Sequence, residues 1–261
     1  MYKFCTSLVF VFTSAILLCS EEIYKYEDMV LQELKANKQS MSKKEIKKWA
    51  NFISKWSEPD FYRKEIEAFK KSDSKNFPKK KTILFIGSST IVFWKNLEKD
   101  MFPYEILNRG FGGAHINHVN NHFDEIVAPY KPRGIVFFCG TNDLAALKSP
   151  QQVFDNFLSF YKKVNNSLPK TKVFVIGIKP TIARDHLKEK ELNLNSLTAN
   201  LAKQEDNLIY INVWDDMLLK NGKADPSLFV QDGLHLNEDG YEIWNNLVKP
   251  HLKSNFKPDK T

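Results

Sequence analysis

The stretch ILFIGSSTIVFW, residues 83–94, decides the fold. Its apolar start ends at Gly87, two serines and a threonine follow, and helical spacing of apolar residues then begins. A strand that enters a small-residue turn at the start of a helix is the basic unit of α/β proteins, and it commonly holds a ligand or a nucleophile. Ser88, Ser89 and Thr90 offer three hydroxyl groups, but each also suits a helix N-cap. The stretch alone leaves open whether any of them does chemistry.

Strands and helices alternate along the rest of the chain. Four further apolar runs resemble the first one: YEILNRG (104–110), GIVFFCG (134–140), KVFVIGI (172–178) and LIYINV (208–213). Such near-continuous runs are typical of parallel strands covered by helices on both faces. Helical stripes of apolar residues lie between them, and a last one covers 238–252. The pattern predicts an α/β fold, a three-layer α/β/α sandwich with a mostly parallel five-stranded sheet.

The N-terminus resembles an export signal. Lys3 precedes an apolar run at 8–18, which is too short to span a bilayer comfortably, so residues 1–20 are predicted to be a signal peptide. Cys19 stands where a lipoprotein signal places its acylated cysteine, although the preceding Leu18 is larger than the residue usually found there. Cleavage near Cys19 by an ordinary signal peptidase is the alternative. We expect an exported protein, periplasmic, extracellular or anchored to a membrane through its N-terminus.

Composition and charge limit the classes of partner. The 261 residues are 43% hydrophobic, which suits one sizeable domain, predicted at 58–254, with a helical arm or linker at 21–57 and a tail at 255–261. The net charge is +7, and residues 21–80 hold 15 Lys/Arg against 11 Asp/Glu. Because these charges alternate along helices, they indicate solvated faces and no nucleic-acid site. Cys139 ends an apolar run, which predicts a buried side chain. The oligomeric state stays open.

Four polar or glycine-rich stretches follow predicted strands: GSS (87–89), NRGFGG (108–113), GTND (140–143) and DGLHLN (232–237). In parallel sheets these ends meet at one edge, where ligands bind. Asp232 lies three residues before His235, so the carboxylate could orient the imidazole. The glycines and the asparagine could donate N–H groups to an oxyanion. Each stretch alone equally fits a helix cap or a turn, but together they form the set that acyl transfer needs.

These four blocks, in this order, resemble the SGNH hydrolases, also called GDSL lipases and esterases. The resemblance covers about residues 81–252 and implies a flavodoxin-like fold. By the family pattern, Ser89 is the nucleophile, and Asp232 and His235 complete a catalytic triad. The pattern also implies an oxyanion hole built from the backbone N–H groups of Ser89 and Gly113 and from the side-chain amide of Asn142. It implies neither a cofactor nor a metal.

One position departs from the family pattern. The first block of the family reads Gly-Asp-Ser, whereas this chain has Ser88 in place of the aspartate. That position supports the loop, so we expect Ser88 and Asp143 to do so here, and Thr90 to start the helix. The two adjacent serines leave the register of the nucleophile open between Ser88 and Ser89.

The sequence therefore predicts a serine esterase that hydrolyses small or short-chain acyl esters, acetyl esters of a carbohydrate among them. The alternative is a non-catalytic exported protein that binds carbohydrate or lipid on the same fold, since fold does not fix function. His115, His118 and His122 share one helical face and could ligate zinc. That spacing more often marks one side of a helix, so no metal site is predicted. GFGG lacks the spacing of a dinucleotide-binding loop.

Overall fold

The computed structural model describes residues 24–36 and 38–259. The predicted signal peptide, with Cys19, lies outside these residues. The chain divides into two compact units after Phe61. Export and the predicted domain boundaries stay predictions.

The described residues of the first unit are largely helical, as the sequence predicts. A helix covers 24–36, and α2 (Lys43–Trp56) follows it. α2 begins with a capping box, in which Ser42 and Glu45 bind each other's backbone N–H groups. Trp49 stacks on Phe52 at 5.3 Å between ring centroids, and both rings are exposed. Within 24–36 and 38–259, no helix is both long enough and apolar enough to cross a membrane.

The second unit is built on a five-stranded parallel sheet, which confirms the predicted fold class. Its strands are β1 (Ile83–Gly87), β2 (Ile106–Gly110), β3 (Gly134–Phe138), β4 (Lys172–Ile176) and β5 (Leu208–Ile211). Their order is β2-β1-β3-β4-β5, and all neighbours are parallel. In register, Gly87 lies opposite both Gly110 and Phe138. The strands that carry the first three motif blocks are therefore neighbours that end together.

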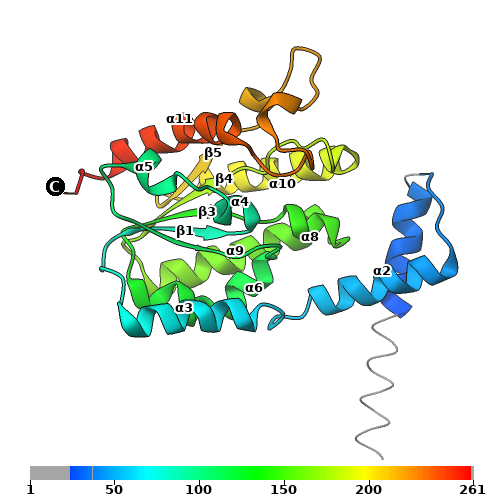
Figure 1. Ribbon diagram of the computed structural model, residues 1–261, viewed down its shortest axis with the longest axis horizontal. Coiled ribbons are helices and arrows are strands. Elements are labelled where there is room, and N and C mark those ends of the chain that lie inside the picture. The colour runs from blue at the N-terminus through cyan, green and yellow to red at the C-terminus, as the bar shows by residue number, and fades with distance from the viewer. Residues whose placement is uncertain (1–23, 37, 260–261) are drawn as a thin grey trace, which may run out of the picture. The chain divides into compact units, whose positions relative to one another are not determined.

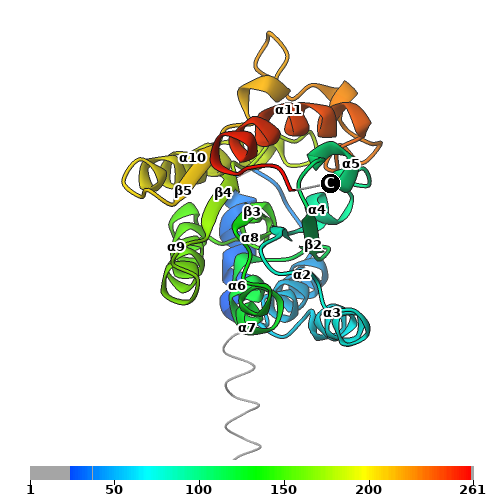
Figure 2. The same ribbon diagram turned by 90° about the vertical axis from the view of Figure 1, so that its left-hand side faces the viewer.

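Helices cover both faces of the sheet (Figure 1). Phe137 and Phe138 of β3 show the two faces, because successive side chains on a strand point to opposite sides. Phe137 packs on Phe160 of α9 (Pro150–Ser167) at 4.5 Å, and Phe138 packs on Trp244 of α11 (Glu238–Asn255) at 4.8 Å. α6 (Ile116–Asn121) and α10 (Lys188–Ala202) contact α9. α5 (Leu97–Met101) contacts α11, and α4 (Ser89–Val92) is joined to it by the Tyr241 hydroxyl, which donates to the Thr90 carbonyl oxygen. Figure 2 shows α11 and α5 on one side of the sheet and α6 and α7 on the other.

The helices of the second unit are α3 (Arg63–Lys75), α4 (Ser89–Val92), α5 (Leu97–Met101), α6 (Ile116–Asn121), α7 (Phe123–Ile126), α8 (Thr141–Ala145), α9 (Pro150–Ser167), α10 (Lys188–Ala202) and α11 (Glu238–Asn255). Short 3₁₀ helices lie at Ala128–Tyr130, Asp185–Leu187, Asp215–Met217 and Pro226–Leu228. Cys139 follows β3 and is buried, as predicted.

The first helix of this unit, α3, packs against the sheet domain through polar contacts. Asp73 near its end is paired with Arg109 of β2 and accepts a hydrogen bond from the Tyr130 hydroxyl at 2.6 Å. Arg63 at its start donates to Glu125 of α7 at 2.9 Å. α3 therefore belongs to the second unit.

Candidate active site

The block predicted to carry the nucleophile leaves β1 through a turn that only glycine allows. Gly87 has a φ of 145°, and a Cβ at this position would lie 1.9 Å from the carbonyl oxygen of Phe138. The backbone N–H of Ser88 donates to that same oxygen at 3.0 Å, which joins the ends of β1 and β3. α4 then begins at Ser89, so the half-exposed Ser89 side chain lies at the carboxyl edge of the sheet.

Ser89, His235 and Asp232 form a connected line of hydrogen-bonding groups. Ser89 Oγ lies 2.8 Å from His235 Nε2, and His235 Nδ1 lies 2.6 Å from Asp232 Oδ2. The other carboxylate oxygen, Oδ1, accepts the backbone N–H groups of Leu234 and His235 at 2.8 and 2.9 Å. An ionised carboxylate can only accept, so Nδ1 carries the proton and Nε2 is free to accept one from Ser89.

Asp232 is held in its ionised form. Its partial burial raises its pKa, but hydrogen bonds from the His235 ring and from the backbone N–H groups outweigh this effect and lower the pKa to about 2. The carboxylate is therefore charged over the whole range in which a histidine can act as a base.

The two adjacent serine side chains have different surroundings in the structure. Ser88 is 1% exposed, and its Oγ has no hydrogen-bond partner within 24–36 and 38–259. The support expected from its hydroxyl therefore stays a prediction without a hydrogen bond to carry it, whereas the backbone N–H of Ser88 binds the Phe138 carbonyl oxygen. The helix starts at Ser89, one residue before the predicted Thr90. Asp143 makes the expected contacts: it accepts the Ile116 N–H at 3.1 Å and pairs with Lys148 at 2.7 Å.

The two blocks predicted to supply oxyanion donors lie side by side. Gly113 follows β2 in a turn with a φ of 76°, and Asn142 lies in α8, after β3. Asn142 is 5% exposed, and its Nδ2 donates to the carbonyl oxygen of Ala114 at 3.1 Å. The amide of Asn142 is therefore bonded to the residue next to Gly113.

The loop after β4, residues 177–187, contacts both halves of the site, although none of its residues is among the predicted site residues. Lys179 donates to the carbonyl oxygen of Leu234 at 2.5 Å, inside the block that carries Asp232 and His235. Arg184 donates to Asn142 Oδ1 at 3.0 Å. The signal was present in the sequence, because KPTIAR follows a predicted strand at the same sheet edge as the other blocks.

The three histidines do not lie on one helical face, because α6 holds only His118. All are buried: His115 caps α6, His118 lies inside it, and His122 follows it. His118 Nδ1 accepts the backbone N–H of His115 at 2.9 Å, and His122 Nδ1 lies 3.0 Å from Glu125 Oε1. Burial lowers the pKa of His115 to about 2. In the part of the chain that the structure describes, no group of three or more His, Cys, Asp or Glu side chains could hold a metal ion.

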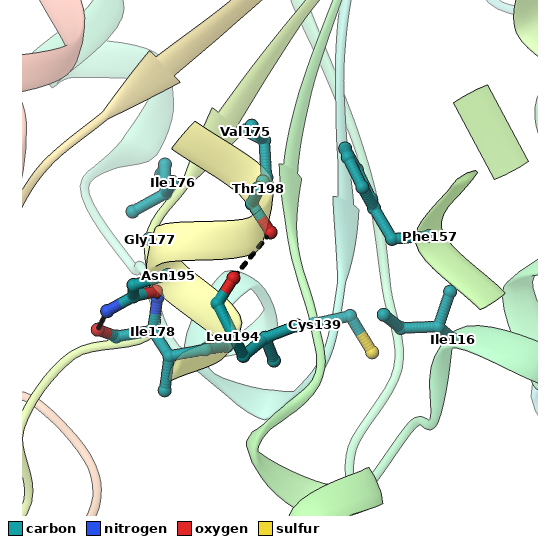
Figure 3. A pocket seen from close by; sticks show the side chains of 10 residues that line it. All are labelled: Ile116, Cys139, Phe157, Val175, Ile176, Gly177, Ile178, Leu194, Asn195 and Thr198. Atoms are coloured by element: carbon teal, nitrogen blue, oxygen red, sulfur yellow. Dashed lines mark hydrogen bonds between the residues drawn. The ribbon is translucent and has the colours of Figure 1, made fainter. Parts of the chain in front are cut away.

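Two cavities differ sharply in size. The first, of about 10 Å³, lies between α9, α10 and β4 and has room for about one water molecule (Figure 3). The second, of about 480 Å³, lies against Asp232 and His235. Phe93 and Val230 form part of its walls, and the Phe93 ring lies edge-on to His235 at 4.9 Å between centroids. Only the second cavity is large enough for a small organic ligand.

Solved structures of low sequence identity share the fold. A protein from Streptococcus pneumonia named after platelet activating factor has a TM-score of 0.67 and 21% identity, over 81% of this chain and 100% of that one. A GDSL-like lipase from Bacteroides thetaiotaomicron has a TM-score of 0.59 and 23% identity, over 77% of this chain and 100% of that one. A family 3 carbohydrate esterase from Talaromyces cellulolyticus has a TM-score of 0.54 and 15% identity, over 66% of this chain and 96% of that one. No curated protein matches the chain significantly.

The family assignment comes from the sequence match. Residues 92–243 match the model of the GDSL-like lipase/acylhydrolase family, a stretch that includes three of the four blocks and begins three residues after Ser89. The first block lies outside the match, and its place beside His235 comes from the geometry. The resemblance found in the sequence is thus confirmed, and the chain belongs to the GDSL-like lipase/acylhydrolase family of ester-bond hydrolases.

Proposed function

We propose that the protein is a serine esterase that hydrolyses small or short-chain acyl esters through an acyl-enzyme on Ser89. The observation that carries this proposal is the line from Ser89 Oγ to His235 Nε2 at 2.8 Å and from His235 Nδ1 to Asp232 at 2.6 Å. A serine hydroxyl is a weak nucleophile unless a neighbouring base takes its proton. Here the base is within hydrogen-bond reach and is oriented by a carboxylate.

The reaction proceeds in two halves. Ser89 Oγ attacks the ester carbonyl carbon while its proton passes to His235 Nε2, and Asp232 stabilises the resulting imidazolium. The oxyanion accepts hydrogen bonds from the backbone N–H groups of Ser89 and Gly113 and from Asn142 Nδ2. His235 then protonates the leaving alcohol as its bond to the acyl carbon breaks. Water next attacks the acyl carbon while His235 takes one of its protons, and His235 returns that proton to Ser89 Oγ as the bond to the acyl group breaks and the carboxylic acid leaves.

The cavity beside His235 supports a small substrate. The leaving alcohol departs on the His235 side, because that ring protonates its oxygen, and the cavity of about 480 Å³ opens against the same ring. The exposed ring of Phe93 offers a stacking surface, while Lys95 and Asn96 add polar groups that could bind hydroxyls. An acetylated sugar fits this combination, and one structural neighbour is a carbohydrate esterase. Acetyl esters of a carbohydrate are therefore the first substrates to test.

We also propose that the protein is exported, from the sequence of residues 1–20. Mass spectrometry of the mature N-terminus tests this proposal. A lipid adduct on Cys19 would support membrane anchoring, and an uncleaved chain would contradict export.

The test of the activity is an ester panel with a nucleophile variant. Acetylated sugars and p-nitrophenyl esters of increasing acyl length should be hydrolysed by the wild type, with the shortest acyl groups preferred. Ser89→Ala should lower kcat by about 10⁶-fold, the scale seen when a serine hydrolase loses its nucleophile. Ser74→Ala, an exposed serine of α3, is the matched control. Wild-type turnover in Ser89→Ala would exclude the acyl-enzyme, and an inactive wild type that binds sugar or lipid would favour the non-catalytic alternative.

A further inference from the structure

Arg184 lies outside the four motif blocks but donates hydrogen bonds to two side chains of the third block, GTND. Its Nη2 donates to Asn142 Oδ1 at 3.0 Å, and its Nη1 donates to Thr141 Oγ1 at 3.1 Å. We infer that Arg184 is a positioning residue for the esterase reaction, which holds the Asn142 amide so that one N–H points at the oxyanion. This inference rests on the proposed function.

The contacts of Asn142 determine which way its amide faces. Arginine has only donors, so the atom that faces Arg184 must be the amide oxygen. The backbone carbonyl of Ala114 only accepts, so the atom that faces it must be the amide nitrogen. Both contacts demand the same orientation. One hydrogen of Nδ2 is used by Ala114, and the second is left for the substrate.

The charge on Arg184 also strengthens the donor. A guanidinium bonded to the amide oxygen draws electron density from the amide and makes the N–H groups on its other end better donors. The arginine is half-buried, where such an interaction is less screened than at the surface. Lysine could supply the charge, but it lacks the planar fork that reaches two acceptors at once.

Thr141 is itself oriented to receive Arg184. Its hydroxyl donates to Glu191 Oε1 at 3.1 Å, so its lone pairs are left for the guanidinium. Glu191 lies in α10 and is 1% exposed. A chain of three oriented groups therefore runs from α10 through the GTND block to Arg184.

The backbone that carries Arg184 is fixed at both ends. Asn195 of α10 binds the backbone N–H of Ile178 at 2.7 Å and its carbonyl oxygen at 2.8 Å, which pins the start of the loop (Figure 3). The backbone N–H of Ala183 donates to the Gly233 carbonyl oxygen at 3.1 Å. Arg184 therefore lies on a segment whose backbone is held by hydrogen bonds. A residue that positions another side chain needs such a rigid support.

The inference predicts a defined kinetic effect. Arg184→Ala should lower kcat for p-nitrophenyl acetate by about 10- to 100-fold, the range of a charge-assisted hydrogen bond, and leave KM nearly unchanged. Arg184→Lys should recover only part of this loss, because it restores the charge without the fork. Arg133→Ala is the matched control, since Arg133 precedes β3 at the opposite edge of the sheet and binds Asp259.

A double-mutant cycle with Asn142→Ala tests whether Arg184 acts through that amide. If it does, Arg184→Ala should have little further effect in the Asn142→Ala background. An equal fold loss in both backgrounds, or a rise in KM at unchanged kcat, would overturn the inference. The side-chain amide signal of Asn142 in an NMR spectrum should also shift in Arg184→Ala, which can be measured without a substrate. A wild type inactive on every ester would refute the proposed function, whereas an unshifted amide signal would refute the role of Arg184.

Discussion

Replacing Asp232 by asparagine tests the triad more sharply than deleting it. In the wild type, Oδ1 accepts two backbone N–H groups at 2.8 and 2.9 Å, while Oδ2 faces His235 Nδ1 at 2.6 Å. An asparagine must keep its oxygen toward the two N–H groups, because its NH₂ group cannot accept from them. The NH₂ group therefore faces Nδ1 and donates to it. The proton of the imidazole moves to Nε2, which then cannot accept the proton of Ser89.

The expected loss follows from this inverted tautomer. Asp232→Asn should lower kcat by about 10⁴-fold, which corresponds to about 5 kcal/mol of transition-state stabilisation. The free energy of unfolding should fall by about 1 kcal/mol or less, because both backbone hydrogen bonds survive and the altered contact with His235 is partly exposed. Steady-state hydrolysis of p-nitrophenyl acetate and urea denaturation measure the two quantities. Asp216→Asn, an exposed aspartate, is the control. A kcat within about tenfold of the wild-type value would refute the assignment of Asp232 as the orienting group.

Three further changes give distinct expected results. Ser88→Ala should raise the free energy of unfolding by about 1 kcal/mol in urea denaturation, since it removes a buried hydroxyl that has no hydrogen-bond partner among the described residues. The same variant should keep kcat near the wild-type value. A loss of activity would reopen the choice of nucleophile between Ser88 and Ser89. Gly87→Ala should destabilise the protein by about 3 kcal/mol or more, because its Cβ would meet the Phe138 carbonyl oxygen at 1.9 Å; an unchanged Tm would contradict the strained turn. Burial raises the pKa of Glu191 from 4.5 to about 7, so the folded wild type holds a proton that the unfolded chain lacks between these values and loses stability as pH rises through them. The stability of Glu191→Gln relative to the wild type should therefore increase from about pH 5 to about pH 8. If the difference between the urea midpoints of the two proteins were the same at both pH values, this would argue against a buried ionisable Glu191.

The strands and the order of the blocks could be predicted because each has a local cause. A run such as GIVFFCG is apolar throughout, since β3 is buried on both faces. Glycine at position 87 marks a turn in which any larger residue would collide with the neighbouring strand. These requirements act within a few residues of the chain and leave their mark in its sequence. The parallel sheet then brings the blocks together at one edge.

The direction of individual side chains could not be predicted in the same way. The adjacent hydroxyls of Ser88 and Ser89 are equivalent on the page, and only the backbone at the β1 exit turns one inward and the other toward His235. The prediction that the three histidines share one face required a helix over residues 115–122, whereas α6 covers only Ile116–Asn121. Both cases depend on a few backbone angles that neighbouring strands and loops determine.

The role of the loop after β4 shows a different limit. Lys179 reaches the block of His235, and Arg184 reaches the block of Asn142, yet the loop itself carries none of the groups proposed to react. A base on one segment and an oxyanion donor on another must each stay within about 0.5 Å of the position that catalysis requires. The loop after β4 binds both segments, through Lys179 and Arg184, and Asn195 of α10 binds the backbone near its start. A residue such as Arg184 is proposed to act by orienting another side chain, Asn142, and a requirement of that kind appears in the contacts between segments and in no single motif.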